Sequence, residues 1–193
     1  MEIKVEDIKN NQKNLLVETQ NLLEKCEIEK VKEPLFISTY QLYNDDSGEL
    51  KSILTGFFKG LKGNLIYTVS FEAPQSSEDI QGLFRIYKAK KEHAMSKVNY
   101  QKELEKKVLY VGSSKGSNLK TRMCNHFGVG SKGVFSMHII HWLPKEINSG
   151  IKVQLYKISG PDHSTANINL TELIEQGFWD ELKPMFGKRS GLL

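Results

Sequence analysis

The stretch that decides the fold is VLYVGSSKGSNLKTRMCNHFG, residues 108–128. Its first part is rich in aliphatic residues that favour a buried strand: Val108, Leu109 and Val111. Glycines and serines follow, which predicts a tight turn. Three apolar residues then recur every four positions and predict one face of a helix: Leu119, Met123 and Phe127. Arg122 and His126 lie one turn apart beside that face, so we expect them to meet Tyr110 at one edge of a sheet.

Helical and strand patterns alternate along the rest of the chain. Helical spacing predicts one helix over residues 5–30. A second predicted helix begins at a cap, either Asn169 or Thr171, and runs to about Leu182. Branched and aromatic residues predict strands over residues 35–43, 65–71, 134–143 and 151–158. Residues 82–88 fit either a helix, with Leu83, Phe84 and Tyr87 on one face, or a strand, and their aromatic and branched content favours the strand. We therefore predict an α/β (α+β) fold with a small central mixed or antiparallel sheet flanked by helices.

The composition is typical of a soluble globular protein. Of its 193 residues, 39% are hydrophobic and 26% are charged, which is enough apolar mass for a core. No apolar run approaches the roughly 20 residues needed to span a bilayer, and the start of the chain has no signal-peptide core, so we expect a cytoplasmic protein. Cys26 and Cys124 indicate reduced thiols. The net charge of +4 permits nucleic-acid binding without arguing strongly for it.

The central stretch resembles the GIY-YIG nuclease family. In that family a Tyr-x-Gly strand precedes a helix that carries Arg and, four residues later, Tyr or His. Tyr110-Val111-Gly112 matches the strand, and Arg122 and His126 match the helix pair. The resemblance covers roughly residues 81–191 and implies a small nuclease domain.

The first half of the family motif, Gly-Ile-Tyr, has two candidates in this chain. We favour Gly82-Leu83-Phe84, which keeps the Gly but places Phe84 where the first Tyr is usual, so that a hydroxyl is missing. The alternative is Leu65-Ile66-Tyr67, which keeps the Tyr and lacks the Gly. Under the favoured alignment residues 89–107 form an insertion between the two motif strands, and residues 1–75 form an N-terminal extension ahead of a domain over residues 76–193.

The family also carries a metal-binding Glu on a late helix, followed nine residues later by Pro and three further by Asn. Glu175 and Pro184 keep the first spacing, whereas Gly187 stands at the Asn position. Glu172 is the alternative ligand. A single protein carboxylate suffices for Mg²⁺, because water and substrate phosphate complete its coordination.

The resemblance implies a DNA endonuclease that uses Mg²⁺ or Mn²⁺. Tyr110 would activate or orient the attacking water with help from His126, or His126 would be the base itself. Arg122 would hold the scissile phosphate, and Glu175 would hold the metal. Five further residues are the implied DNA contacts: Gly112, Lys115, Lys120, Lys188 and Arg189.

Two other functions remain open. A nucleic-acid-binding module with weak or no cleavage would fit Phe84 and Gly187. A different α/β enzyme would bind metal through His138 and His141, although three apart on a strand these side chains would face opposite sides. The N-terminal extension would serve dimerisation or target recognition, so the expected partners are DNA and a second copy of the chain.

Overall fold

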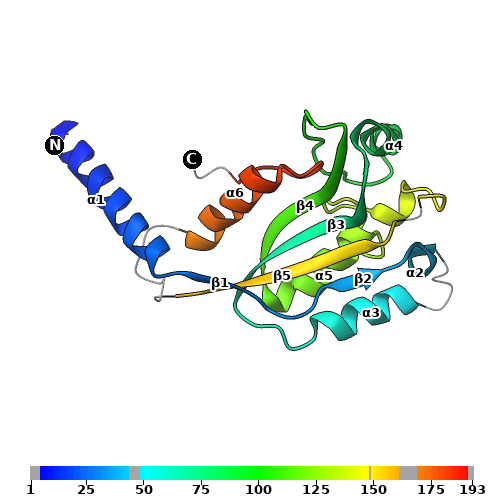
Figure 1. The fold of residues 1–193 in the computed structure, drawn as a ribbon, viewed down its shortest axis with the longest axis horizontal. Helices are drawn as coiled ribbons and strands as arrows, with labels where there is room; N and C mark the ends of the chain where they lie inside the picture. Colours follow the sequence, from blue (N-terminus) through cyan, green and yellow to red (C-terminus); the bar gives the residue numbers. More distant parts are fainter. Residues whose placement is uncertain (1–4, 44–47, 148, 161–168, 191–193) are drawn as a thin grey trace.

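The computed structural model describes residues 5–43, 48–147, 149–160 and 169–190. Within them lies one antiparallel sheet in the order β1-β5-β3-β4 (Figure 1). Its strands are β1 (Glu27–Lys30), β5 (Ile151–Ser159), β3 (Asn64–Ser76) and β4 (Glu105–Lys115), and β2 (Leu35–Ile37) also pairs with β5. The predicted α/β (α+β) class is confirmed, with an antiparallel sheet.

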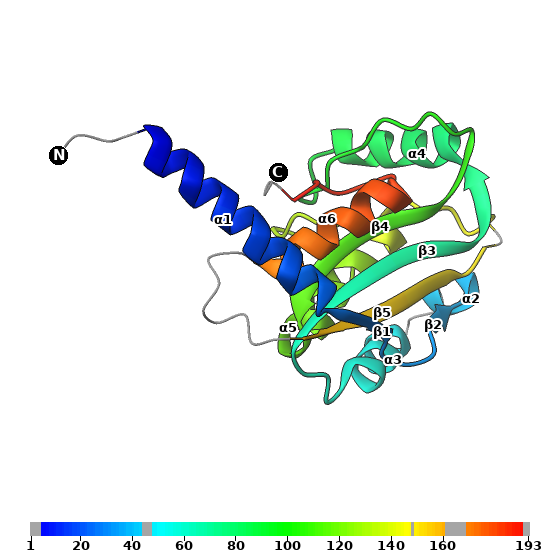
Figure 2. The same cartoon turned by 60° about the vertical axis from the view of Figure 1, so that its left-hand side comes forward.

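Helices cover both faces of this sheet. They are α2 (Thr39–Tyr43), α3 (Glu49–Phe58), α4 (Ser77–Ala89), α5 (Gly116–Phe127) and α6 (Leu170–Leu182), whereas α1 (Val5–Glu24) contacts α6 and extends away from the sheet (Figure 1). Side chains alternate along β3, so Ile66 packs in a cluster with Ile174 of α6, while Tyr67 packs in a separate cluster with Met123 of α5. Figures 1 and 2 show α5 and α6 over opposite faces, both close to β4.

The segment predicted as a strand over residues 82–88 is helical. It belongs to α4, whose N-terminus is capped by Ser76, the side chain of which accepts a hydrogen bond from the Asp79 N–H. The helical spacing of Ile80, Phe84 and Tyr87 points all three into the core. The prediction was wrong because the short apolar run fits both periods, and the polar cap upstream decides between them.

Other predicted elements differ in extent. Residues 134–143 are not a strand but a loop with a 3-10 helix (Ile139–His141), and the expected strand at 35–43 divides into β2 and α2. The expected helix at 5–30 ends at Glu24, after which the chain enters β1.

The expected boundary at residue 75 falls inside β3, which pairs with both β4 and β5. The strands of the predicted extension therefore share one sheet with the rest of the chain. The connection between β3 and β4 contains the whole of α4 and runs to residue 104, rather than being confined to residues 89–107. Among the described residues, no helix is long and apolar enough to cross a membrane.

Candidate functional site

The pairing of β3 with β4 brings two tyrosines together. Tyr67 lies opposite Gly112 in the register of the two strands. Its ring is nearly parallel to that of Tyr110, with 6.1 Å between the ring centroids. Tyr67 is fully buried and Tyr110 is partly exposed. The tyrosine that the sequence analysis held as the alternative therefore stands beside Tyr110.

Phe84 belongs to α4, not to a strand that pairs with β4. The preference for Phe84 over Tyr67 as the first motif residue, on a strand beside Tyr110, was wrong. The Phe84 ring stacks on Phe186 with 4.1 Å between centroids and meets Trp142 edge-on at 5.3 Å. A fully buried apolar ring in such a setting packs the core. The hydroxyl-bearing ring beside Tyr110 is that of Tyr67.

Helix α5 carries the next two residues of the candidate site, Arg122 and His126. Its predicted apolar face is confirmed, since Leu119, Met123 and Phe127 are buried. The helix begins where Gly116 donates a backbone hydrogen bond to Gly63, just before β3. This contact ties the start of α5 to the start of β3. One face of α5 thus stays beside the tyrosine pair.

His126 is buried between two hydroxyl groups. Its Nε2 lies 3.0 Å from the Tyr67 hydroxyl, and its Nδ1 lies 2.8 Å from Ser136 Oγ. Burial, together with the nearby Arg122 charge and His138, lowers the pKa of His126 to about 3. The imidazole is therefore neutral at physiological pH, with one ring nitrogen donating and the other accepting.

Arg122 supplies the positive charge of the cluster. Its guanidinium carbon lies 5.9 Å from the centre of the Tyr67 ring, and the side chain keeps solvent-exposed surface. Burial raises the pKa of both tyrosine hydroxyls, and the Arg122 charge opposes that rise in each. An arginine beside two phenols and open to solvent is suited to bind a phosphate.

Glu175 reaches the same place from α6 on the other face of the sheet. Of the two caps predicted for α6, Asn169 and Thr171, the structure has Asn169, whose side chain accepts a hydrogen bond from the Glu172 N–H. Ser113 of β4 donates a hydrogen bond to Glu175 Oε2. Burial raises the pKa of the Glu175 carboxyl, whereas Ser113 and the Arg122 charge oppose that rise.

One half-buried carboxylate fits a Mg²⁺ ion that takes its other ligands from water and phosphate. The described residues hold no group of three or more His, Cys, Asp or Glu arranged to bind a metal. Glu172, the alternative ligand, instead accepts a hydrogen bond from Ser190. Glu175 is the better candidate of the two, because its carboxyl also lies close enough to Arg122 to interact with that charge.

Two glycines allow backbone to approach the tyrosines. A side chain at Gly112 would lie 2.5 Å from the Tyr67 hydroxyl, so this position admits only glycine without movement. At Gly187, where the family has Asn, a side chain would lie 2.8 Å from the Tyr110 ring, and φ is +107°. A side chain at residue 187 would therefore be strained and would require the Tyr110 ring to move.

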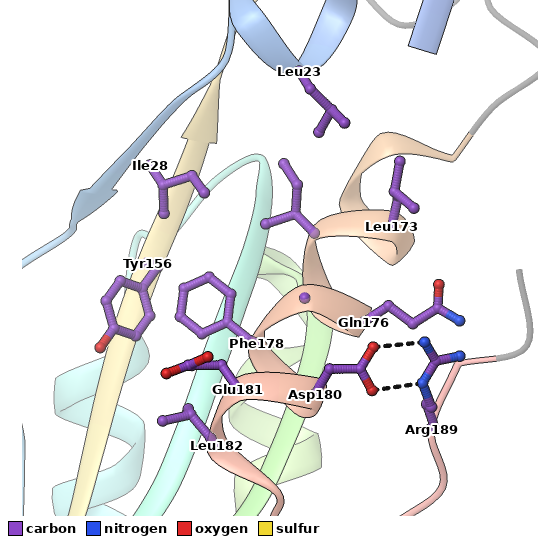
Figure 3. Close-up of a pocket in the computed structure, with 12 residues that line it drawn as sticks. Leu23, Ile28, Tyr156, Leu173, Gln176, Phe178, Asp180, Glu181, Leu182 and Arg189 are labelled. Carbon is purple, nitrogen blue, oxygen red and sulfur yellow. Dashed lines mark hydrogen bonds and ion pairs between the residues drawn. The ribbon is translucent and has the colours of Figure 1, made fainter. Parts of the chain in front are cut away.

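The expected DNA contacts differ in their surroundings. Lys115, Lys120 and Lys188 are exposed. Arg189 forms a bidentate ion pair with Asp180, at N–O distances of 2.6 and 2.7 Å. Figure 3 shows this pair at the rim of a pocket beside α6.

That pocket lies apart from the tyrosine cluster. It has a volume of about 640 Å³ and an apolar lining from α1, β1, β5 and α6, including Leu23, Ile28 and Phe178. Neither tyrosine of the pair lines it, nor do Arg122, His126 and Glu175. It is therefore a separate feature of the molecule.

The two histidines of the third alternative lie near each other, not on opposite faces of a strand. His138 precedes the 3-10 helix and His141 ends it, and their ring centroids are 6.4 Å apart. His93 lies between them, with ring centroids 4.7 Å from His138 and 4.3 Å from His141. As stated above, the described residues form no metal-binding group, and this trio is no exception.

Two residues of the site carried no usable sequence signal. Ser113 is one of several loop-like serines, and only the strand alternation of β4 turns it toward Glu175. Ser136 lies outside every motif and contacts His126 only in the folded chain.

Comparison of the chain with models of known families, with curated proteins and with solved structures found no match.

Proposed function

We propose that this protein is a Mg²⁺-dependent DNA endonuclease with a site of the GIY-YIG type. One observation carries the proposal: a tyrosine pair, an arginine, a histidine and a glutamate from four separate elements converge around β3 and β4. They are Tyr67, Tyr110, Arg122, His126 and Glu175. Four of these, Tyr110, Arg122, His126 and Glu175, are candidates that the family resemblance implies, and Tyr67 is the alternative that it offers for the first motif tyrosine.

Hydrolysis of a phosphodiester requires a bound phosphate and an activated water. Arg122, charged and exposed, is the group to bind the phosphate oxygens. Tyr110 is partly exposed and Tyr67 fully buried, so Tyr110 is our candidate for contact with the attacking water. Tyr67 lies behind it as a hydrogen-bonding support.

His126 is assigned a positioning role rather than that of general base. A base with a pKa of about 3 has little affinity for the proton of water near neutral pH. Its two hydrogen bonds instead fix its ring against Tyr67. This assignment favours Tyr110 over His126 as the residue that activates water.

Glu175, oriented by Ser113, would hold the metal ion. When bound, Mg²⁺ or Mn²⁺ supplies positive charge that stabilises the phosphate and its leaving oxygen. Lys115, at the end of β4, and Lys120, in the first half of α5, are exposed and would contact the DNA backbone.

A DNA-binding protein with weak cleavage is the second candidate. Two observations favour it. The family's Asn has no counterpart at Gly187, where a side chain would collide with Tyr110. Burial also raises the pKa of both tyrosine hydroxyls, which makes either a poorer base.

Cleavage of supercoiled plasmid in the presence of Mg²⁺ tests the proposal. The wild type and Glu181→Ala, which removes an exposed carboxylate from the same helix as Glu175, are expected to cut. Arg122→Ala and Glu175→Ala are expected to lose about 100-fold or more in rate. Equal cutting by all four proteins, or cutting by none, would contradict the assignment. DNA binding without cutting, lost in Arg122→Ala and kept in Glu175→Ala, would support the second candidate.

A further inference from the structure

Five apolar residues of α1 lie on one face of the helix: Val5, Leu15, Leu16, Leu22 and Leu23. At the C-terminal end of this face, Leu22 packs against the cluster that contains Ile174 of α6. Toward the N-terminus, Leu16 and Val5 are 65% and 66% exposed. Figures 1 and 2 show this part of α1 extending away from the other described elements. Most of the apolar face is therefore uncovered within one copy of the chain.

The exposed face of α1 has the features of a contact surface. Helices in proteins are stabilised mainly by packing of an apolar face rather than by helix propensity, and contiguous exposed apolar surface marks an interaction site. Thr19 is a polar residue on the same face, and its hydroxyl donates to the Leu15 carbonyl at 2.7 Å. It can therefore be covered without leaving an unpaired donor.

The same face leads into the apolar pocket beside α6. Leu23, at the C-terminal end of the face, lines this pocket together with Ile28 of β1 and Phe178 of α6 (Figure 3). The projecting helix and the pocket at its base thus form one apolar surface. A symmetric dimer requires such a self-complementary surface, because a two-fold axis brings each copy's surface against the same surface of the other.

Two exposed charges distinguish the possible orientations of a helix pair. Lys9 and Glu24 lie on the side of the apolar face that carries Leu16. Along one helix they are about 22 Å apart, so they do not pair within a copy. In an antiparallel pair that crosses near Leu16, Lys9 of each helix lies beside Glu24 of the other. In a parallel pair they stay about 22 Å apart along the axis, so charge complementarity favours the antiparallel pair.

The antiparallel pair also places the helix N-terminus at the pocket. Along the helix axis, Val5 lies about 16 Å from Leu16 on one side and Leu23 about 10 Å on the other. Val5 of one copy therefore reaches past Leu23 of its partner, to the level of the pocket. We propose that two copies of this chain form a symmetric dimer in which the α1 helices pack antiparallel and the N-terminal end of each covers the other's pocket. This inference goes beyond the proposed function and does not rest on it.

Sedimentation equilibrium of the full chain, at loading concentrations of about 1 to 100 µM, tests the dimer. The wild type is expected to show a mass of twice 22.0 kDa at the higher concentrations. Leu16→Asp places a charge at the crossing point and is expected to raise the dissociation constant about 100-fold or more. Ile86→Asp changes an exposed apolar residue on α4 and is expected to match the wild type.

An exchange of charges tests the antiparallel orientation. Lys9→Glu and Glu24→Lys each place like charges beside each other in the proposed dimer, so each is expected to raise the dissociation constant about 10-fold. The double variant restores opposite charges and is expected to return to the wild-type value. Lys59→Glu, at the end of α3, changes the charge of the chain equally and serves as the matched control.

A wild type that stays monomeric at every concentration, or a dimer that Leu16→Asp leaves intact, would overturn the proposal. Single charge variants that weaken the dimer without rescue in the double variant would contradict the antiparallel pairing. Leu16 is exposed in one copy, so Leu16→Asp is expected to keep the far-ultraviolet circular dichroism of a folded chain. If no variant cuts plasmid DNA, the proposed function fails while the dimer result still stands.

Discussion

Two aromatic residues of the same core, Tyr67 of β3 and Phe84 of α4, illustrate how similar rings acquire different roles. Both are fully buried, and each follows two residues of a motif-like triplet. Tyr67 meets Tyr110, Arg122 and a histidine that hydrogen-bonds its hydroxyl. Phe84 meets Phe186 and Trp142. The difference teaches that a candidate site residue is identified by the polar partners of its functional group rather than by the letters around it.

The largest effect should come from the apolar member of this pair. Phe84→Ala is expected to lower the free energy of unfolding by about 3–5 kcal/mol, because it opens a cavity between Phe186 and Trp142. Urea denaturation measures the change. Ile86→Ala, on the exposed side of α4, should stay within about 0.5 kcal/mol of the wild type. Similar losses in both variants would show that Phe84 does not pack as described.

Tyr67→Phe should lower the free energy of unfolding less than Phe84→Ala does, but it should lower the cleavage activity more. Removing the hydroxyl leaves His126 Nε2 buried without a partner, which predicts a loss of about 1–3 kcal/mol. If the proposed function holds, plasmid cleavage should fall as well, whereas Phe84→Leu should leave the rate of the folded protein near that of the wild type. Tyr156→Phe, on the neighbouring strand β5, is the matched control. Full cleavage by Tyr67→Phe would remove Tyr67 from the site.

The free energy of unfolding should depend on pH because of His126, the hydrogen-bond partner of Tyr67. The folded-state pKa of His126 is about 3, far below its ordinary value of 6.5, so the unfolded chain binds a proton that the folded chain excludes. Stability is therefore complete above pH 6.5 and falls as pH drops, by about 1.4 kcal/mol per pH unit for one such proton. Burial also lowers the pKa of His93 and His138, which adds to the same trend.

Urea denaturation at pH 7, 6 and 5 measures this slope, in a range above most carboxyl pKa values. His126→Asn should have a shallower slope than the wild type, and Phe84→Leu should keep the wild-type slope. A slope that His126→Asn leaves unchanged would mean that other groups are responsible for it.

The smallest expected effect is the change in the free energy of unfolding on replacing a glycine by alanine, which should have opposite signs at Gly82 and Gly112. Gly82 lies inside α4 with open space around it, so Gly82→Ala should raise the free energy of unfolding by about 0.5–1 kcal/mol. Gly112→Ala should instead destabilise, because the new carbon would lie 2.5 Å from the Tyr67 hydroxyl. Thermal unfolding of both variants measures the contrast. A destabilised Gly82→Ala would argue against the helix at this position.

Local patterns predicted the elements that carry their own start and stop signals. The strand and helix over residues 108–127 and the Asn169-capped helix that ends at Leu182 were both correct. Their signals are the alternation of side chains, a spacing of four residues and a capping side chain, all of which act within a few residues. Arg122, His126 and Glu175 were instead named as candidates through the resemblance to a family motif.

Residues 82–88 and 134–143 were predicted incorrectly because their apolar residues fit more than one period. Phe84 is turned into the core by a helix whose cap lies several residues upstream. Residues 134–143 gain their order from backbone bonds to the distant segment Ala94–Ser96 and from the Trp142 Nε1–H, which donates to the Met137 carbonyl. Such contacts replace the strand pairing that the branched residues suggested.

The sequence by itself determined the fold class, which follows from the periodicity of its apolar residues, whereas the residues of the candidate site came from the resemblance to a family motif. Tertiary structure alone decided which tyrosine faces Tyr110, why a side chain at Gly187 would be strained, and that Ser113 and Ser136 orient the charged and hydrogen-bonding groups. The physical reason is that strand register and side-chain contacts depend on the whole core being packed at once, which no short stretch of sequence can specify.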